Sequence, residues 1–592
     1  MKSQDVCFIK EEVYEYPNKE FLFRPSMEYP EYPFKGDVSK TKNEIYEMIR
    51  RGLYYLKLDI GNFDSVAWNP LGEFINSGDR VLIKPNLVSD RNFIKKGTDC
   101  LYTHPALVAA VIDYVYIALK GKGTIVVGDA PVQECDFERL IEESGYKKLV
   151  EYYKGKGIDI ALVDFRNVKT FWKDGLHYNQ NESNVDDNGI IVQLNEDSAF
   201  SSMSGRHLKT LRITNYDPRI IQRHHNLYCH EYKIAKEVLI SDVIINMPKP
   251  KTHRKAGITV SLKNMIGINA NKEFLPHHAI GSKEEGGDAY QTKSVWFTLA
   301  NRILDKKNIW NREGKEVIAK LADKLYRFVY NNGAKTIKEK YWEGSWYGND
   351  TIWRTILDIN KILFYADKDG KMKKSVQRRM FIVGDMIVVG EKEGPLSPSP
   401  VKIGMIAMGK NQVCFDRAVC SLMGFDYKLI PSLNKAGDMR YGLTDGLELE
   451  PYIISNDARW HGKSISDIKV NASLDIEPSS GWEYILGNPK KDEIIDEIKS
   501  LNKPIYIFGA GNCGIDIACY IKKKTDIDIL GFYDNDKRKW NLEILDNIYC
   551  MKPKTPDRPC VCLISVKQEF IESIKEDAQR LGFKNIVICA YD

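Results

Sequence analysis

The sequence lacks the cysteine patterns of metal-binding and redox proteins. Its 12 cysteines include no C-x-x-C pair, so neither a zinc ribbon nor a ferredoxin-type iron–sulfur cluster is expected. The first six residues carry no apolar signal core, and no apolar run is long enough to span a bilayer. These absences predict a cytoplasmic protein with reduced thiols, without an iron–sulfur cluster and without a membrane span.

A charge excess of one sign is also missing. The 86 basic and 81 acidic residues leave a formal net charge of +5 over 592 residues, and no motif of the common nucleic-acid-binding folds is present. Nucleic acid is therefore not an expected partner. At 43% hydrophobic and 28% charged residues, a chain of this length is expected to form two or three globular domains.

What the chain does contain is a basic loop stiffened by proline. The apolar residues 243–245 are typical of a buried strand, and two prolines in the next five residues hold the backbone extended. Lys249, Lys251 and His253 follow at the carboxyl end of this strand, where open α/β sheets bind ligands. Several cationic donors on a rigid loop suit a phosphate or a carboxylate. The alternative is a solvated basic turn.

Similar polar residues follow other expected strands. One strand ends at Lys84 and Asn86, a helix opens at His104, and the next strand ends at Asp129. This strand–helix–strand order predicts a parallel α/β sheet. Each residue alone is explained by local hydrogen bonding, but together they predict a shared pocket at one sheet edge. Asp129 is interpreted as fixing a nearby lysine, because no partner acids have the spacing of metal ligands. The alternative is that it is a metal ligand.

Three further residues are candidates for this pocket. Asn264 lies on an expected short helix after the basic loop, and Asp385 ends a strand that begins near residue 381. His277 lies in a loop shaped by proline and glycine. Its imidazole is an acid/base candidate because it titrates near neutral pH. The alternative is that it only hydrogen-bonds its own loop.

The C-terminal part carries a G-x-G-x-x-G turn after an apolar strand. Gly509, Gly511 and Gly514 would permit close approach to a phosphate at a helix N-terminus. A second strand ends at Asp534, where a ribose-binding acid belongs. The pattern predicts a Rossmann-like domain that binds NAD, a nucleotide or a nucleotide sugar. The alternative is a degenerate fold used for contacts.

These patterns predict a division of the chain. We expect an N-terminal segment over 1–78, a core over 79–470 with a helical insertion around 290–366, a linker over 471–500 and a Rossmann-like domain over 501–592. The expected fold class is α/β, with mostly parallel sheets.

Two runs resemble a known family. The run from Ile245 to His253 and the run from Gly257 to Gly267 resemble the core signature of the bacterial family catalogued as domain of unknown function 362. More distantly, the segment is similar to lactate racemases, through residues that match in type: Asn246, Lys249, Pro250, Leu262, Lys263 and Met265. His253 is offset from the histidine of that family. This second similarity implies isomerisation or epimerisation, and a nickel-pincer nucleotide as a further cofactor.

The C-terminal glycine turn, with residues 531–536, resembles modules that accompany surface-polysaccharide enzymes. Our leading hypothesis is a cytoplasmic enzyme, an isomerase or epimerase linked to surface polysaccharide biosynthesis, that acts on an anionic nucleotide sugar or hydroxy acid. The expected catalytic residues are Lys249, His253, His104 and His277. The expected substrate-binding residues are Lys84, Asn86, Lys251, Asn264, Asp129 and Asp385. The alternative is a non-catalytic nucleotide-sensing or scaffold protein of envelope biosynthesis.

Overall fold

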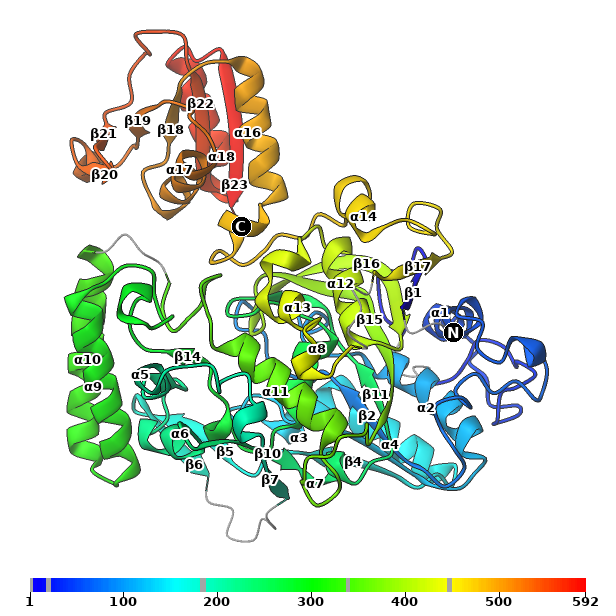
Figure 1. Ribbon diagram of the computed structural model, residues 1–592. Helices are drawn as coiled ribbons and strands as arrows, with labels where there is room; N and C mark the ends of the chain where they lie inside the picture. Colours follow the sequence, from blue (N-terminus) through cyan, green and yellow to red (C-terminus); the bar gives the residue numbers. More distant parts are fainter. Residues whose placement is uncertain (1–3, 18–22, 181–187, 337–340, 445–449, 592) are drawn as a thin grey trace. The chain divides into compact units, whose positions relative to one another are not determined.

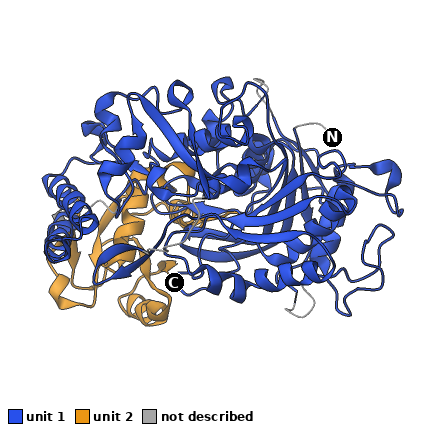
Figure 2. Cartoon of the chain, turned by 90° about the horizontal axis from the view of Figure 1, so that it is seen from below, with its two compact units in different colours: residues 1–474, 478–482 blue, residues 475–477, 483–592 orange. Residues whose placement is uncertain are grey.

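The computed structural model describes residues 4–17, 23–180, 188–336, 341–444 and 450–591. The chain forms two compact units (Figures 1 and 2). Unit 1 comprises residues 1–474 and 478–482, and unit 2 comprises residues 475–477 and 483–592.

Unit 1 is built on one large sheet that is mostly parallel. Among the described residues its main path runs β17-β1-β16-β15-β11-β2-β3-β4. Neighbours from β15 through β11, β2 and β3 to β4 are parallel, whereas β16 is antiparallel to both β15 and β1. The strands are β1 (Asp5–Lys10), β2 (Arg80–Pro85), β3 (Thr124–Asp129), β4 (Ile160–Asp164), β11 (Val243–Met247), β15 (Arg379–Glu393), β16 (Ser397–Gly409) and β17 (Tyr452–Ser455). The predicted α/β class with mostly parallel sheets is confirmed.

Alternation along the strands sends side chains to opposite faces of this sheet. Val81 and Ile83 of β2 join the buried cluster formed with the helices α1 (Glu44–Tyr55) and α2 (Pro105–Leu119). In β2 the apolar run gives way to Lys84 at the carboxyl end of the strand. Asp385, predicted to end its strand, instead lies inside β15, because that strand continues to Glu393. The sheet therefore supplies a rigid frame whose carboxyl edge carries the polar groups.

The segment over 290–366 is largely helical. It contains α9 (Val295–Arg312), α10 (Glu316–Thr336) and α11 (Ile352–Tyr365). The helices α9 and α10 pack against each other as an antiparallel hairpin (Figure 1). Within the part of the chain that the structure describes, no helix is both long and apolar enough to cross a membrane.

Unit 2 is a smaller α/β sheet in the order β20-β21-β19-β18-β22-β23. The strands are β18 (Ile505–Phe508), β19 (Ile529–Tyr533), β20 (Glu543–Leu545), β21 (Ile548–Met551), β22 (Val561–Lys567) and β23 (Asn585–Tyr591). Counted in chain order without the antiparallel β20, the parallel strands run 3-2-1-4-5, which is the order of dinucleotide-binding sheets. The helices α16 (Pro489–Leu501), α17 (Asn512–Lys524) and α18 (Ile571–Arg580) accompany this sheet.

Candidate functional site

A cavity of about 430 Å³ opens beside the carboxyl ends of β2 and β3 in unit 1. Five of the predicted site residues line it, namely Asn86, Asp129, His253, Asn264 and His277. Cavities of this size hold small-molecule ligands. The structure therefore brings these five residues together around one cavity.

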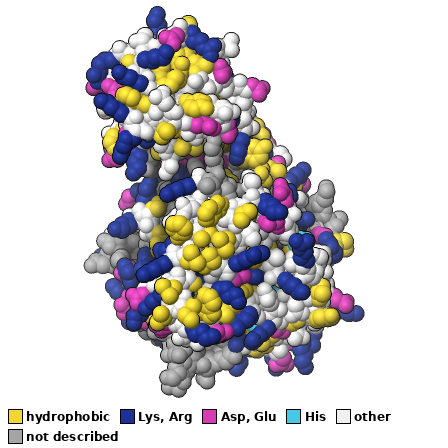
Figure 3. Space-filling model, turned by 90° about the vertical axis from the view of Figure 1, so that its left-hand side faces the viewer, with side chains coloured by type: hydrophobic (Ala, Val, Ile, Leu, Met, Phe, Trp, Pro, Cys, Tyr) yellow, Lys and Arg dark blue, Asp and Glu magenta, His cyan; other side chains and the backbone are white. Residues whose placement is uncertain are grey.

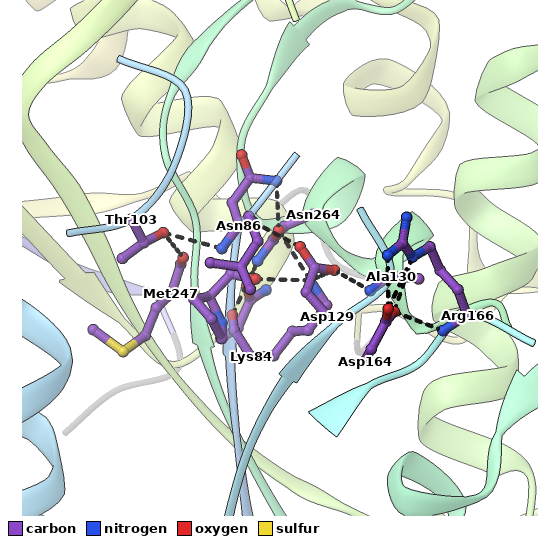
Figure 4. Close-up of polar contacts among 12 residues, drawn as sticks. Lys84, Asn86, Thr103, Asp129, Ala130, Asp164, Arg166, Met247 and Asn264 are labelled. Carbon is purple, nitrogen blue, oxygen red and sulfur yellow. Dashed lines mark hydrogen bonds and ion pairs between the residues drawn. The ribbon is translucent and has the colours of Figure 1, made fainter. Parts of the chain in front are cut away.

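A buried ion pair joins Lys84 to Asp129, and Asp129 lines the cavity (Figure 4). The Lys84 ammonium is 2.7 Å from the Asp129 carboxylate and donates to the Pro85 carbonyl at 2.9 Å and to Asn264 Oδ1 at 3.3 Å. Asp129 also accepts from the backbone N–H groups of Leu87 and Ala130, at 2.7 and 2.8 Å. Both charges are thus fully engaged by the protein.

Asn264 joins this pair to the neighbouring strands. Its Nδ2 donates to Asn246 Oδ1 at 2.8 Å and to the Lys84 carbonyl at 3.2 Å, and its Oδ1 also accepts from Asn86 Nδ2 at 3.0 Å. Asn86 Oδ1 in turn accepts from the Lys251 ammonium. Since each amide is held on both its oxygen and its nitrogen, the network has one orientation.

The short helix α8 (Ser261–Asn264) presents Asn264 because a carboxylate holds its first turn. Asp416, on α12 (Gln412–Leu422), accepts from the backbone N–H groups of Ser261 and Leu262, at 2.8 and 2.9 Å. These are N–H groups that a helix start leaves without partners. Burial raises the pKa of Asp416 to about 7, although these hydrogen bonds oppose the rise.

A glycine lets the backbone approach the ion pair. A Cβ atom on Gly267 would lie 1.9 Å from Asp129 Oδ1 and 2.9 Å from Lys84 Nζ. The Gly267 carbonyl accepts from the Ala130 N–H at 2.9 Å, which ties this segment to the end of β3. The position therefore excludes any side chain.

Lys249, His104 and Asp385 form a second buried cluster. The Lys249 ammonium lies 3.0 Å from the Asp385 carboxylate, and both side chains are 0% exposed. Asp385 also accepts from the Tyr16 hydroxyl at 2.8 Å and from the backbone N–H of His104 at 2.9 Å. The His104 ring stacks on Tyr16, with 3.9 Å between centroids, and its Nδ1 accepts from the Ala106 N–H at 3.2 Å.

The three predicted substrate-binding and catalytic lysines do not line the cavity. Lys84, Lys249 and Lys251 are fully buried, and the described residues that line the cavity include none of them. The Lys251 ammonium also donates to the Leu101 carbonyl at 2.7 Å, and burial lowers its pKa to about 7. The basic loop thus turns its lysines inward, to partners within the protein.

The cations that do reach the cavity include Lys263 and Lys272, which sequence reasoning missed as ligand-binding residues. Within the described residues, neither ammonium makes a hydrogen bond or an ion pair. Burial lowers the pKa of Lys263 to about 8, and the nearby charge of Lys272 contributes. A clue for Lys263 was its place on α8 beside Asn264, but nothing distinguishes Lys272 within its loop.

His253 presents an N–H group to the cavity. The turn between β12 (Lys251–His253) and β13 (Gly257–Thr259) brings the backbone N–H groups of Lys255 and Ala256 to its Nδ1, at 3.0 and 3.1 Å. An accepting Nδ1 carries no hydrogen, so the neutral ring has its hydrogen on Nε2. Burial, with the positive charges of Lys263 and Lys255, holds the pKa of His253 well below its usual value.

His277 has the opposite tautomer. Its Nδ1 lies 2.6 Å from the Leu275 carbonyl oxygen, which can only accept, so Nδ1 carries the hydrogen. Nε2 is then left with a free lone pair. Burial, followed by the positive charges of Lys272 and Lys255, holds the pKa of His277 well below its usual value. One cavity therefore contains a neutral imidazole that donates and a neutral imidazole that accepts.

Arg166 fixes the loop that forms another wall of the cavity. Its guanidinium pairs with Asp164 and donates to the carbonyls of Val132 and Cys135, both at 2.9 Å. Glu134 of the same loop lies 3.2 Å from His177 Nε2. Burial raises the pKa of Glu134, but His177 and Lys272 outweigh it and lower the value to about 2. Arg166 and Glu134 thus have protein partners, unlike Lys263.

The glycine turn predicted to bind a cofactor lies in unit 2. A Cβ on Gly514 would lie 1.8 Å from the Gly509 carbonyl oxygen, whereas a Cβ on Gly511 would meet no atom within 4 Å. The Asp534 carboxylate accepts from the Ala510 N–H at 2.9 Å and pairs with Lys539 at 2.7 Å. The middle glycine therefore faces open space, and the acid holds the turn to the end of β19. Among the described residues, no group of three or more His, Cys, Asp or Glu side chains is arranged to hold a metal.

Comparison with known proteins identifies a family for unit 1. A family model described as "Domain of unknown function (DUF362)" matches residues 81–185 and 182–421. A thylakoid-associated protein of Synechocystis, sll1697, is 28% identical over 239 residues, which are 40% of this chain. The matched part spans 53% of that relative's own length.

Solved structures of RSP, a Rex-family repressor, are also similar over a part of the chain. The structure with β-NADH is 19% identical with a TM-score of 0.15, and the other is 17% identical with a TM-score of 0.13. Each match covers 22% of this chain and 56% of the repressor.

The packing at Gly267 gives a first prediction. Gly267→Ala should lower the free energy of unfolding by about 1–3 kcal/mol, because the new methyl group overlaps the Lys84–Asp129 pair. Urea denaturation followed by circular dichroism measures the change. Gly155→Ala is the matched control, since a Cβ there meets no atom within 4 Å. Equal effects of the two substitutions would contradict the close approach.

The buried ion pair of Lys249 and Asp385 gives a second prediction. Lys249→Met should lower the free energy of unfolding by about 3–5 kcal/mol, because it leaves the Asp385 charge buried without its partner. The double variant Lys249→Met with Asp385→Asn should recover part of that loss. Thermal unfolding measures both variants. Lys402→Met is the control, because it breaks an exposed ion pair with Glu15. A double variant no more stable than the single one would refute the ion pair.

Proposed function

Because this chain belongs to the DUF362 family, whose description names no activity, we propose from the cavity that unit 1 binds a small anion and isomerises it by proton transfer. The observation that carries the proposal is a pair of half-buried ammonium groups, which make no hydrogen bond or ion pair within the described residues, beside two imidazoles of opposite tautomer. Lys263 and Lys272 would hold a carboxylate or a phosphate of the substrate.

The histidines suit a proton transfer next to a carbonyl group. The free lone pair of His277 Nε2 can take a proton from the carbon beside the carbonyl and return it. The Nε2–H of His253 can donate to the oxygen on which negative charge develops, as preorganised donors do. Both lowered pKa values keep the rings neutral before the reaction. The same shift weakens His277 as a base, and an anion bound at Lys272 would offset it by cancelling a positive charge that lowers the pKa of His277.

Of the two substrate classes expected, the cavity of about 430 Å³ favours a hydroxy or keto acid, or a sugar-sized anion. The proposed sites remain Asn86, Asp129 and Asn264 for positioning and His253 and His277 for catalysis, now with Lys263 and Lys272. The other predicted residues do not line the cavity and would instead fix the backbone around it: Lys84, Lys249, Lys251, His104 and Asp385. Two lysines, Lys249 and Lys263, match the pattern of the nickel-pincer family. Lys249 is paired with Asp385, and no step is assigned to a nickel-pincer nucleotide.

For unit 2 we propose binding of NAD, a nucleotide or a nucleotide sugar at the turn of Gly509, Gly511 and Gly514. The parallel strand order 3-2-1-4-5 and the open space beside Gly511 support it. Asp534 is engaged by Ala510 and Lys539, so a ribose would have to compete for its carboxylate. A cytoplasmic role in surface polysaccharide synthesis stays part of this proposal.

The unpartnered ammonium groups give a binding prediction. Lys263→Met should weaken the affinity for an anionic ligand about 10- to 100-fold, the loss of one charge-assisted hydrogen bond. Isothermal titration with malate, glycerol phosphate and UDP-glucose measures this, with Lys283→Met in a neighbouring exposed loop as the matched control. The wild-type affinity should fall as the pH rises through about 8, because Lys263 then loses its charge. A wild-type protein that binds none of the three probes would contradict the proposal.

The histidines give a prediction about turnover. In D₂O the protein should exchange deuterium into the carbon beside the carbonyl of the acid that binds, and proton NMR measures the rate. His277→Gln should slow the exchange about 10²- to 10⁴-fold, the usual contribution of a general base, with little change in affinity. The control is His207→Gln, which removes an imidazole that contacts Ser204 outside the cavity. Binding without any exchange would instead favour the nucleotide-sensing or scaffold protein.

A further inference from the structure

The outer face of the helical hairpin α9–α10 carries a row of exposed apolar side chains. On α10, Val317, Leu321 and Phe328 are 74, 61 and 62% exposed. Ile318 and Leu325 are also exposed, and the spacing of all five places them on one side of the helix. Soluble proteins rarely expose a contiguous apolar row of this kind without a partner.

The row continues across the groove to α9. Ile303 and Trp310 of α9 face Ile318, Leu321 and Leu325 of α10 in a shallow apolar groove. Figure 3 shows apolar side chains gathered among lysines and arginines on the side of the molecule that Figure 1 draws on the left, where the hairpin lies. The surface is therefore a two-helix face and not a single helix edge.

The opposite face of the hairpin is already used. Phe297 and Val329 pack in a buried cluster with Tyr290 and Trp342, and the Lys307–Asp323 ion pair joins the two helices at 2.8 Å. Arg212 pairs with Asp305 and holds α9 to the rest of unit 1. The inner face accounts for the attachment of the hairpin to the described part of unit 1, whereas Val317, Leu321 and Phe328 of the outer row stay more than 60% exposed.

The charged side chains around this face indicate which kind of partner would bind it. Exposed Arg302 and Lys306 border the groove, and Lys324 lies beside the apolar row on α10. None of these three cations has an ion-pair partner within the described residues. The acids of the same helices, such as Asp305 and Asp323, are instead paired with cations of the protein.

We propose that the α9–α10 hairpin docks unit 1 on an anionic membrane surface. Val317, Leu321 and Phe328 would enter the boundary between headgroups and acyl chains, and Arg302, Lys306 and Lys324 would face lipid phosphates. Amphipathic helices with an apolar row and basic flanks lie in membrane interfaces in this way. The most exposed apolar side chains project from α10, which suits a soft planar surface better than a concave partner.

Vesicle flotation of the full-length chain tests this docking. The protein should float with phosphatidylcholine vesicles that contain phosphatidylglycerol and should stay in solution with pure phosphatidylcholine. Raising the salt from about 0.1 M to about 1 M should release it, because the Debye length falls from about 10 to about 3 Å.

Two hairpin variants separate the apolar and ionic parts. Leu321→Ser with Leu325→Ser and Phe328→Ser should weaken vesicle binding at least about tenfold, since the apolar insertion is lost. Arg302→Gln with Lys306→Gln and Lys324→Gln should weaken it on the order of a hundredfold, at about fivefold for each cation. Both sets replace exposed side chains, so the folded chain should persist.

A control variant replaces Val66 and Val376 by serine, because these apolar side chains are also more than half exposed and lie elsewhere in unit 1. This variant should bind vesicles like the wild type. The proposal is overturned if the wild type does not float at low salt, or if flotation is unaffected by both hairpin variants. It is also overturned if light scattering shows a dimer that the apolar variant alone dissociates, because the row would then join two copies of the chain.

Discussion

The buried ion pair of Lys84 and Asp129 is the constraint on which the site depends. Removing an ammonium and a carboxylate from water costs several kcal/mol for each ion, and their attraction offsets this only when the remaining donors and acceptors are also satisfied. Here Pro85, Leu87, Ala130 and Asn264 supply those partners. The pair therefore fixes the ends of β2, β3 and α8 relative to one another. Lys263 and Lys272 make no hydrogen bond or ion pair within the described residues, so their ammonium groups are available to a ligand.

The sequence predicted the frame of the site better than its charges. Strand–helix alternation placed Asn86, Asp129 and Asn264 at one edge of a parallel sheet, and all three line one cavity. The same reasoning expected the lysines of the basic loop to face a ligand. Lys249 instead pairs with Asp385, which lies on a strand far along the chain. Which carboxylate meets which lysine depends on the order of strands in the sheet, and local sequence does not contain that order.

The chemistry of the two histidines is equally a property of the fold. His253 and His277 are the same residue type, and the sequence treated both as acid/base candidates. The backbone distinguishes them, because two N–H groups reach Nδ1 of His253 and a carbonyl oxygen reaches Nδ1 of His277. These main-chain groups exist at every residue, so their positions leave no trace in composition or spacing. A donor and an acceptor thus arise from identical side chains.

The cations of the cavity and those of the hairpin differ in how far water reaches them, and therefore in the kind of anion that each would bind. A half-buried cation such as Lys263 can offset the loss of water by losing a proton or by gaining an anion. Its pKa of about 8 keeps it charged at neutral pH, which leaves the anion as the route. The cations on the α9–α10 hairpin are exposed, so water already satisfies them and a single small anion would bind weakly there. They gain a partner only when many negative groups are presented together beside an apolar layer. Under the two proposals, the same residue type would bind a single anion in the cavity and a charged surface at the hairpin.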